Sequence, residues 1–85
     1  MTEENVKRFL RYPSSQLVTF AINLANLTWQ EEQTIVMCGQ RGMTQEVAAE
    51  RMDRSVDSVQ KWYRSALKKL SVAWSDCAWI NKILN

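Results

Sequence analysis

Basic side chains gather in one short part of the sequence, and they are the residues best suited to bind another molecule. Residues 51–70 carry six lysines and arginines against two aspartates, an excess of four positive charges. The whole chain of 85 residues has a net charge of only +2. A local basic block can neutralise the phosphate groups of a nucleic acid. It can equally be a solvated surface that binds no ligand. Which interpretation holds depends on the secondary-structure elements that carry these residues.

Side chains that catalyse reactions or bind metals are scarce. Histidine is absent, which removes the commonest general base and every zinc site that needs an imidazole. The chain has only two glycines and no glycine-rich phosphate-binding loop. Cys38 and Cys77 lie far apart in the sequence, and we expect both to be small buried hydrophobic residues. We therefore expect a protein that is not an enzyme and that has no metal or cofactor.

The apolar periodicity predicts an all-α domain of five to six helices that contains a helix-turn-helix. One proline and two glycines leave little material for the turns of a many-stranded sheet. The expected helices cover residues 3–11, 15–26, 29 to Gly39 or Gly42, 45–52 and 56–70. Residues 72–84 form either a continuation of the last helix or a separate one.

Helix start and stop signals support these boundaries. Pro13 ends the first helix. Thr28 and Glu31 form a capping-box pattern, in which each side chain bonds the backbone amide of the other. The segment Gly39-Gln40-Arg41-Gly42 is the expected C-cap and turn after the third helix.

Two helices carry more apolar residues than one small core can cover. In the second helix, one stripe holds Leu17, Phe20, Ala21 and Leu24, and a second holds Val18, Ile22 and Ala25. We expect this helix to be packed on two sides. The C-terminal region also has two stripes, one with Ala73, Trp74, Cys77 and Leu84 and one with Val72, Trp79 and Ile83. We expect self-association through this segment, as a homodimer.

A helix-turn-helix pattern overlaps the basic block. Thr44 and Ser55 are good N-caps for its two helices. Ala49 is the small residue that lets the second helix cross the first closely. Asp53 tolerates the left-handed backbone of the turn, and Val59 is the inward residue one turn along. The intervals of four residues from Ala49 to Asp53 and six from Asp53 to Val59 are those of the motif.

The middle of the chain resembles region 4 of primary sigma factors. It is similar also to the LuxR-type response-regulator domain and to small phage transcription regulators. The matching residues are Leu27-Thr28, Gly42-Met43-Thr44-Gln45-Glu46, Ala49-Glu50-Arg51-Met52, Ser55, Val59 and Ala66-Leu67-Lys68-Lys69-Leu70. The chain departs from region 4 at Val56 and Ser58, where that family usually has arginines. We accordingly divide the domain into an N-terminal segment 1–26, a sigma region 4-like part 27–70 and a C-terminal helix 71–85.

The resemblance implies that the second helix of the motif enters the major groove of double-stranded DNA. The DNA-binding residues that it implies are Thr44, Gln45, Arg54, Ser55, Val56, Asp57, Ser58, Gln60, Lys61, Arg64 and Lys68. Gln60 can pair with adenine and Lys61 can donate to guanine. Arg64 and Lys68 continue this face towards the DNA backbone, and Thr44, Gln45 and Arg54 would contact phosphates near helix N-termini.

The leading hypothesis is a sequence-specific DNA-binding transcription regulator, encoded by a phage or mobile element and acting as a dimer on paired half-sites. One alternative is a protein-interaction module that binds RNA polymerase or another partner through the same scaffold. Another is the DNA-recognition part of a phage packaging protein, a small terminase. No run of eighteen apolar residues and no signal peptide is visible, so we expect a cytoplasmic protein without a membrane segment.

Overall fold

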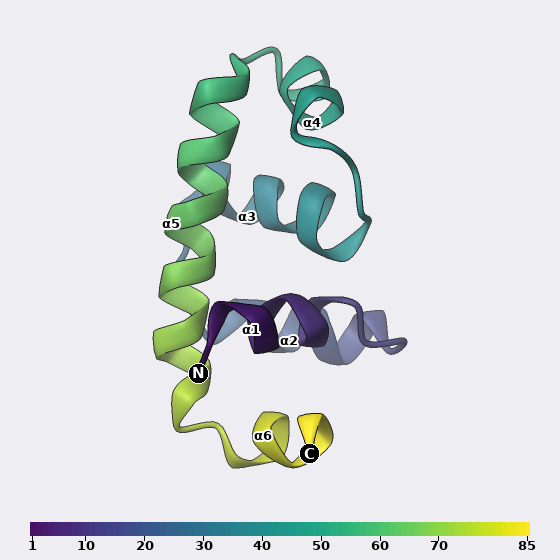
Figure 1. Ribbon diagram of the computed structural model, residues 1–85, viewed down its shortest axis with the longest axis vertical. Coiled ribbons are helices and arrows are strands. Elements are labelled where there is room, and N and C mark those ends of the chain that lie inside the picture. Colours follow the sequence, from purple (N-terminus) through teal and green to yellow (C-terminus); the bar gives the residue numbers. More distant parts are fainter.

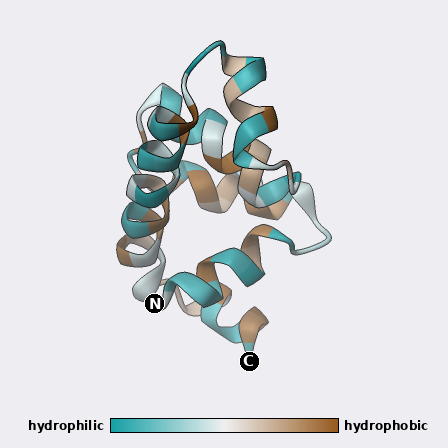
Figure 2. Cartoon of the chain, turned by 45° about the horizontal axis from the view of Figure 1, so that its top comes forward, coloured by the Kyte–Doolittle hydropathy of each residue, from teal (hydrophilic) through white to brown (hydrophobic).

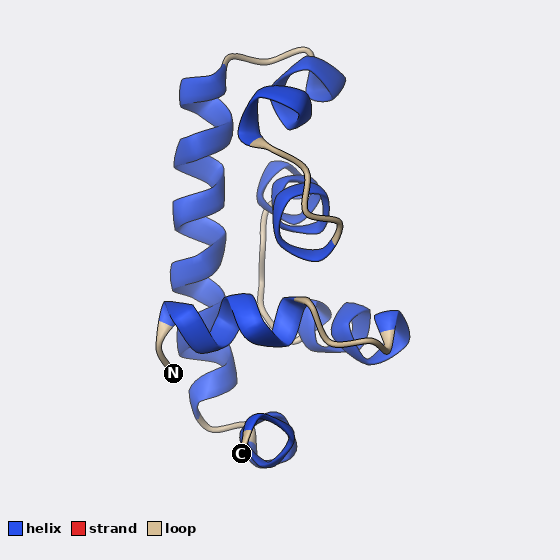
Figure 3. Cartoon of the chain, turned by 45° about the vertical axis from the view of Figure 1, so that its right-hand side comes forward, coloured by secondary structure: helices blue, strands red, loops and turns tan.

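The chain folds entirely into helices and short connections, with no strand (Figure 3). The computed structural model describes all 85 residues. Its six α-helices are α1 (Glu3–Leu10), α2 (Ser15–Asn23), α3 (Trp29–Thr34), α4 (Gln45–Met52), α5 (Val56–Ser75) and α6 (Ala78–Leu84), and a π-helical segment, η1 (Ile35–Gln40), continues α3. The prediction of an all-α domain is confirmed. None of these helices combines the length and apolarity needed to cross a bilayer.

The 20-residue helix α5 is the long axis of the molecule (Figure 1). Near its N-terminal end it contacts α3, η1 and α4, and further along it contacts α1 and then α6. The sequence left open whether residues 56–84 form one helix or two. They form two, because α5 continues through Ser75 and the chain turns at Asp76 and Cys77 before α6.

Serine or threonine side chains cap the N-termini of five helices. Thr2, Ser14, Thr28, Thr44 and Ser55 are each in the extended conformation and accept a hydrogen bond from a backbone amide three residues further on. Each of these bonds satisfies one of the amides that the first turn leaves unpaired. The capping box of Thr28 and Glu31 is present as predicted.

Two hydrophobic clusters lie along α5. The small cluster, at the N-terminal end of α5, consists of Cys38, Ala48, Ala49 and Val59. The large cluster has twelve buried residues: Val6, Phe9, Leu10, Val18, Ala21, Ile22, Ile35, Ala66, Leu67, Leu70, Trp74 and Ile80. Along α5, hydrophilic and hydrophobic stretches alternate in Figure 2, as expected for a helix with one buried face.

Helix α2 is packed on one side only, so the prediction that both of its stripes are covered is wrong. Val18, Ala21 and Ile22 are buried. Leu17, Phe20 and Leu24 have 39%, 57% and 48% of their surface exposed. The helix also ends at Asn23 and not at about Asn26. These three residues of the first stripe stay on the surface, where Phe20 alone has an aromatic neighbour, Trp79 of α6.

The two glycines before α4 were both predicted to belong to one C-cap and turn, but they have different positions in the structure. Gly42 has a φ of 73° and is the left-handed residue of the turn. Gly39 lies inside η1, where an added Cβ would come within 2.7 Å of a methyl carbon of Leu10. A Cβ at Gly39 would therefore push the Leu10 side chain aside, and η1 ends one residue later, at Gln40.

The C-terminal stripes are covered unevenly. Trp74 is fully buried, and its indole Nε1 donates to the carbonyl of Ala21 at 2.8 Å. Trp79 packs its ring edge-on against Phe9, while Val72 is 71% exposed. We expected Cys77 to be a buried hydrophobic residue, and this prediction is wrong. Cys77 is the half-buried N-cap residue of α6, because the chain leaves the α5 helix just before it.

Candidate nucleic-acid interface

Helices α4 and α5 are joined by the three-residue connection Asp53–Ser55. Asp53 has φ 54° and ψ 48° and is the only residue other than glycine with a positive φ. The next amide, of Arg54, donates back to the carbonyl of Ala49 at 2.9 Å and so closes the C-terminus of α4. The left-handed backbone predicted at Asp53 is therefore present. It reverses the chain within three residues and places α5 against α4.

Small side chains let the two helices approach each other. Ala48 is fully buried and Ala49 is only 4% exposed, and both pack with Val59 of α5. Half-buried Trp62 and Tyr63 close the edges of this contact. The inward side of α5 is thus occupied by its neighbours, and its opposite side faces outward.

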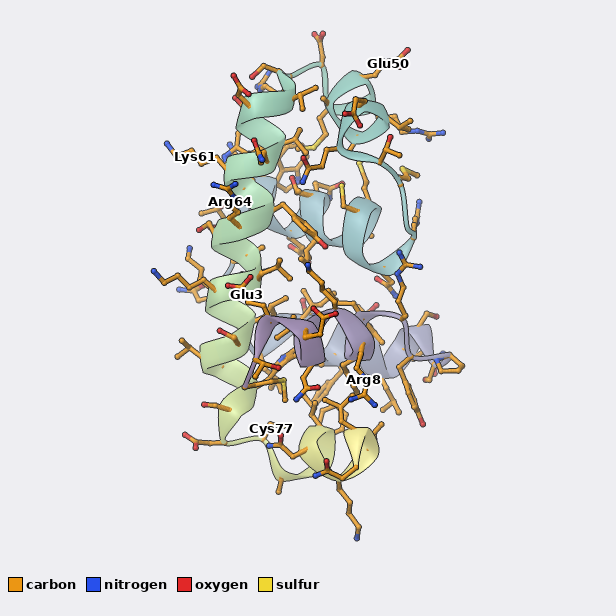
Figure 4. All side chains as sticks on the ribbon, in the orientation of Figure 1. Glu3, Arg8, Glu50, Lys61, Arg64 and Cys77 are labelled. Atoms are coloured by element: carbon orange, nitrogen blue, oxygen red, sulfur yellow. The ribbon has the colours of Figure 1, made fainter.

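The outward side of α5 carries one row of charged residues. Asp57, Lys61, Arg64 and Lys68 follow one another at intervals of four, three and four residues, and all four are exposed. In Figure 4, Lys61 and Arg64 extend from α5 away from α4 and η1. The only ion pair in the structure joins two other residues, so the three cations of this row have no carboxylate partner in the chain. We call these four residues the outward row.

Lys69 belongs to the same basic block of the sequence but has a different position. Its Nζ lies 2.8 Å from Oε1 of Glu31 and forms the ion pair. The other carboxylate oxygen of Glu31 accepts from the hydroxyl of Ser65, and Oε1 also accepts from the amide of Thr28. Burial alone would raise the pKa of Glu31, but these hydrogen bonds outweigh it and lower the pKa from 4.5 to about 2. This network binds α3 to α5 and removes Lys69 from the charge available to a ligand.

The remaining residues expected to read bases flank the outward row. Val56 is 39% exposed, whereas Ser58 and Gln60 are half-buried. Ser55 is exposed, and its hydroxyl caps the amide of Ser58 and bonds the Ser58 hydroxyl at 3.0 Å. Ser55 is therefore mainly a structural residue of the helix start, and Ser58 has only part of its surface free.

The residues expected to contact phosphates begin the two helices or precede α5. Thr44 is exposed, and its Oγ1 accepts from the amide of Val47, which leaves its hydroxyl proton free to be donated. Gln45 is half-buried in the first turn of α4. Arg54 is exposed, and its guanidinium donates to the carbonyl of Asp53 at 3.2 Å.

A second group of basic residues, which the sequence analysis did not single out, lies on α1. Lys7, Arg8 and Arg11 line a cavity of about 470 Å³ between α1, η1 and α5. Arg11 donates from Nε to the carbonyl of Gly39 at 2.8 Å, and Arg8 donates to the carbonyl of Leu84 near the end of α6 (Figure 4). Both arginines thus cap helix C-termini. Because these contacts join distant residues, no local sequence signal predicts them.

Cys38 and Tyr63 also face this cavity, and both carry a raised pKa. Burial raises the pKa of the Cys38 thiol, and the negative charge of Glu46 adds to the effect. Burial likewise raises the pKa of the Tyr63 hydroxyl. Both groups therefore hold their protons more firmly than in water, which is the opposite of what an activated nucleophile needs.

No protein-family model matches the chain, and neither a curated protein nor a solved structure is significantly similar to it.

Proposed function

We propose that this protein binds double-stranded DNA by placing the outward row of α5 in the major groove, and that it regulates transcription by doing so. The observation that carries the proposal is the outward row itself, in which Lys61, Arg64 and Lys68 are exposed and have no carboxylate partner. The only carboxylate in the row, Asp57, stands at one end of it.

The dimensions of α5 suit this role. An α-helix with its side chains is about 10–12 Å wide, and the major groove of B-DNA is about 12 Å wide. The first turns of α5 would approach the base edges, where Lys61 can donate to guanine, Gln60 can pair with adenine and Asp57 can accept from cytosine. Arg64 and Lys68 lie one and two turns further along and would reach the phosphates.

The N-terminus of α4 and the connection between α4 and α5 give the proposal further points of contact with the DNA backbone. The free hydroxyl proton of Thr44 and the exposed guanidinium of Arg54 are donors that suit phosphate oxygens. Gln45 and Ser55 stand beside them in the chain. The resemblance of residues 27–70 to sigma region 4 supports the same placement, and it is our reason for proposing a transcription regulator of a phage or mobile element. We further propose that two copies act on paired half-sites.

The test is selection of DNA sites from a random-sequence pool, followed by titration of the selected duplex with fluorescence anisotropy. Lys61→Ala is expected to weaken binding of the selected site roughly tenfold or more, because it removes a contact to a base. Arg64→Ala is expected to weaken binding to all sequences and to reduce the log–log salt slope by about 0.9, because it removes one phosphate contact. Lys82→Ala is the matched control, since Lys82 is an exposed lysine on α6, and it should change affinity less than about twofold.

Two results would contradict the proposal. One is the absence of any selected sequence, with no binding even at low salt. The other is an equal loss of affinity in all three variants, because that would show general charge attraction without a defined face. Binding to a single stoichiometric protein partner together with no DNA binding would favour the interaction module, for which Asp57 in the row is the supporting observation.

A further inference from the structure

The surface of α2 differs from the rest of the molecule because it carries no charge. From Tyr12 to Gln30 the sequence contains no lysine, arginine, aspartate or glutamate, although charged residues make up 24% of the chain. The whole of α2 lies within this stretch. Depletion of charge combined with exposed apolar side chains is the compositional mark of the centre of a protein interface.

Exposed apolar side chains form a continuous band over this region, which we call the α2 face. It consists of the exposed residues Leu17, Phe20, Leu24, Val72 and Ile83, together with half-buried Trp79. Phe20 lies against Trp79 of α6, with ring centroids 6.1 Å apart. Leu24 and Val72 line one groove between α2 and α5. Ile83 stands one helical turn after Trp79. The band therefore joins three helices.

We infer that the α2 face is the surface through which two copies of this chain pair. In a two-fold symmetric dimer each patch meets its own copy, so any charge on it meets a like charge. No member of the α2 face carries a charge, and of the two lysines that share its groove, Lys68 and Lys69, the second is paired with Glu31. The exposed fractions of its five exposed members correspond to an apolar patch on the order of 450 Å², if a fully exposed residue of this size presents about 180 Å². A standard interface needs about 800 Å² from each partner, and the polar side chains Gln16, Thr19 and Asn23 of α2 can supply the rim.

The position of the α2 face suits the proposed function, which this inference sharpens. Phe20 and Trp79 belong to the end of the molecule where α2 and α6 lie, whereas the small cluster and the start of α5 form the other end (Figure 1). The molecule is 37 Å long. Pairing through the α2 face would therefore leave Asp57, Lys61 and Arg64 of both copies uncovered, whereas Lys68 shares the groove of Leu24 and Val72 and would lie close to the interface.

The experiment measures the mass of the full chain in solution, without DNA, from about 5 µM to about 500 µM by sedimentation equilibrium. The expected result is a reversible change from 9.9 kDa to twice that mass. Phe20→Glu and Leu17→Glu each place two like charges at the interface, and each is expected to raise the dissociation constant roughly a hundredfold. Val47→Glu is the matched control. Val47 is an apolar residue of α4 with the same 39% exposure as Leu17, and the variant should pair like the original chain.

Each outcome is decisive. A monomer at every concentration overturns the inference, and so does an assembly larger than a dimer, which would fit the ring of a packaging protein. Pairing that survives in Leu17→Glu overturns the assignment of the surface. Leu17→Glu makes the inference testable even if Phe20→Glu fails to fold, because Leu17 has no aromatic partner. Since no DNA is present, failure here is distinct from failure of DNA binding.

Discussion

The two hydrophobic clusters along α5 are built in different ways. The large cluster contains Phe9, Trp74 and ten other buried residues from five helical elements, while the small cluster rests on two alanines, a valine and a cysteine. Large side chains bury more apolar surface and stabilise a fold more strongly. The large cluster therefore supplies most of the stability of the chain.

The small side chains of the small cluster have a different effect, because they allow helices α4 and α5 to approach each other closely. Ala48 and Ala49 allow α4 to lie against α5, so that the outward row can face away from the protein. With few buried apolar contacts, this end is expected to open locally at a lower free energy than the other. The comparison indicates that the large cluster, through the continuous helix α5, also holds the first turns of α5 in place, where the proposed DNA-binding residues lie.

Trp74→Ala should have the largest effect. It removes the largest fully buried side chain and leaves the carbonyl of Ala21 without its 2.8 Å partner. We expect a loss of about 3–5 kcal/mol in the free energy of unfolding, measured by urea denaturation followed by circular dichroism. Trp29→Ala is the control, because Trp29 is 66% exposed. Similar losses in both variants would contradict the view that the large cluster stabilises the chain.

Ala49→Leu should have the next largest effect, and a more local one. Three additional carbons between α4 and α5 would overpack the contact and cost about 1–3 kcal/mol. Amide chemical shifts should change around α4 and the start of α5 and remain unchanged around Trp74. Ala78→Leu is the matched control, since Ala78 is exposed in the first turn of α6. Changes spread over both clusters would show that the two ends do not behave as separate units.

Glu31→Gln should have the smallest effect, at the junction between the clusters. Because the pKa of Glu31 is lowered from 4.5 to about 2 in the folded chain, its carboxylate stabilises the fold above about pH 4.5, and this stabilisation is lost as the pH falls towards 2. We expect Glu31→Gln to cost about 1–2 kcal/mol at pH 7 and to have little further effect near pH 2. Unfolding titrations at several pH values measure this difference.

Glu50→Gln is the control for that pH series, because Glu50 is exposed on α4 and its side chain has no hydrogen-bond partner (Figure 4). It should leave the dependence of stability on pH as it is in the original chain. An unchanged pH dependence in Glu31→Gln would contradict the assigned role of the Glu31 network.

Local signals in the sequence predicted local structure correctly. The hydroxyl caps at Thr28, Thr44 and Ser55 and the left-handed backbone at Asp53 depend on residues within a few positions of each other. The inward position of Val59 was also predicted correctly, and Val59 begins the buried stripe that Ala66, Leu67 and Leu70 continue. Whether the outward row binds DNA remains a prediction.

Features that depend on distant parts of the chain were not predicted. The two stripes of α2 are equally apolar, so periodicity could not tell which one other helices would cover. The partners of Glu31 stand 34 and 38 residues away in the sequence. The π-helical turns of η1 were likewise missed, since they accompany the close approach of Leu10 to Gly39.

Helix α5 contributes buried residues to both clusters, Val59 to the small one and Trp74 to the large one. A single inserted residue between them would turn one end relative to the other by about 100° and lengthen the helix by about 1.5 Å. The contacts at one end would then face solvent. Seven inserted residues would restore the phase of the helix after two turns but lengthen it by about 10.5 Å. Because η1 contributes Ile35 to one cluster and Cys38 to the other, we expect α5 to tolerate neither change in length.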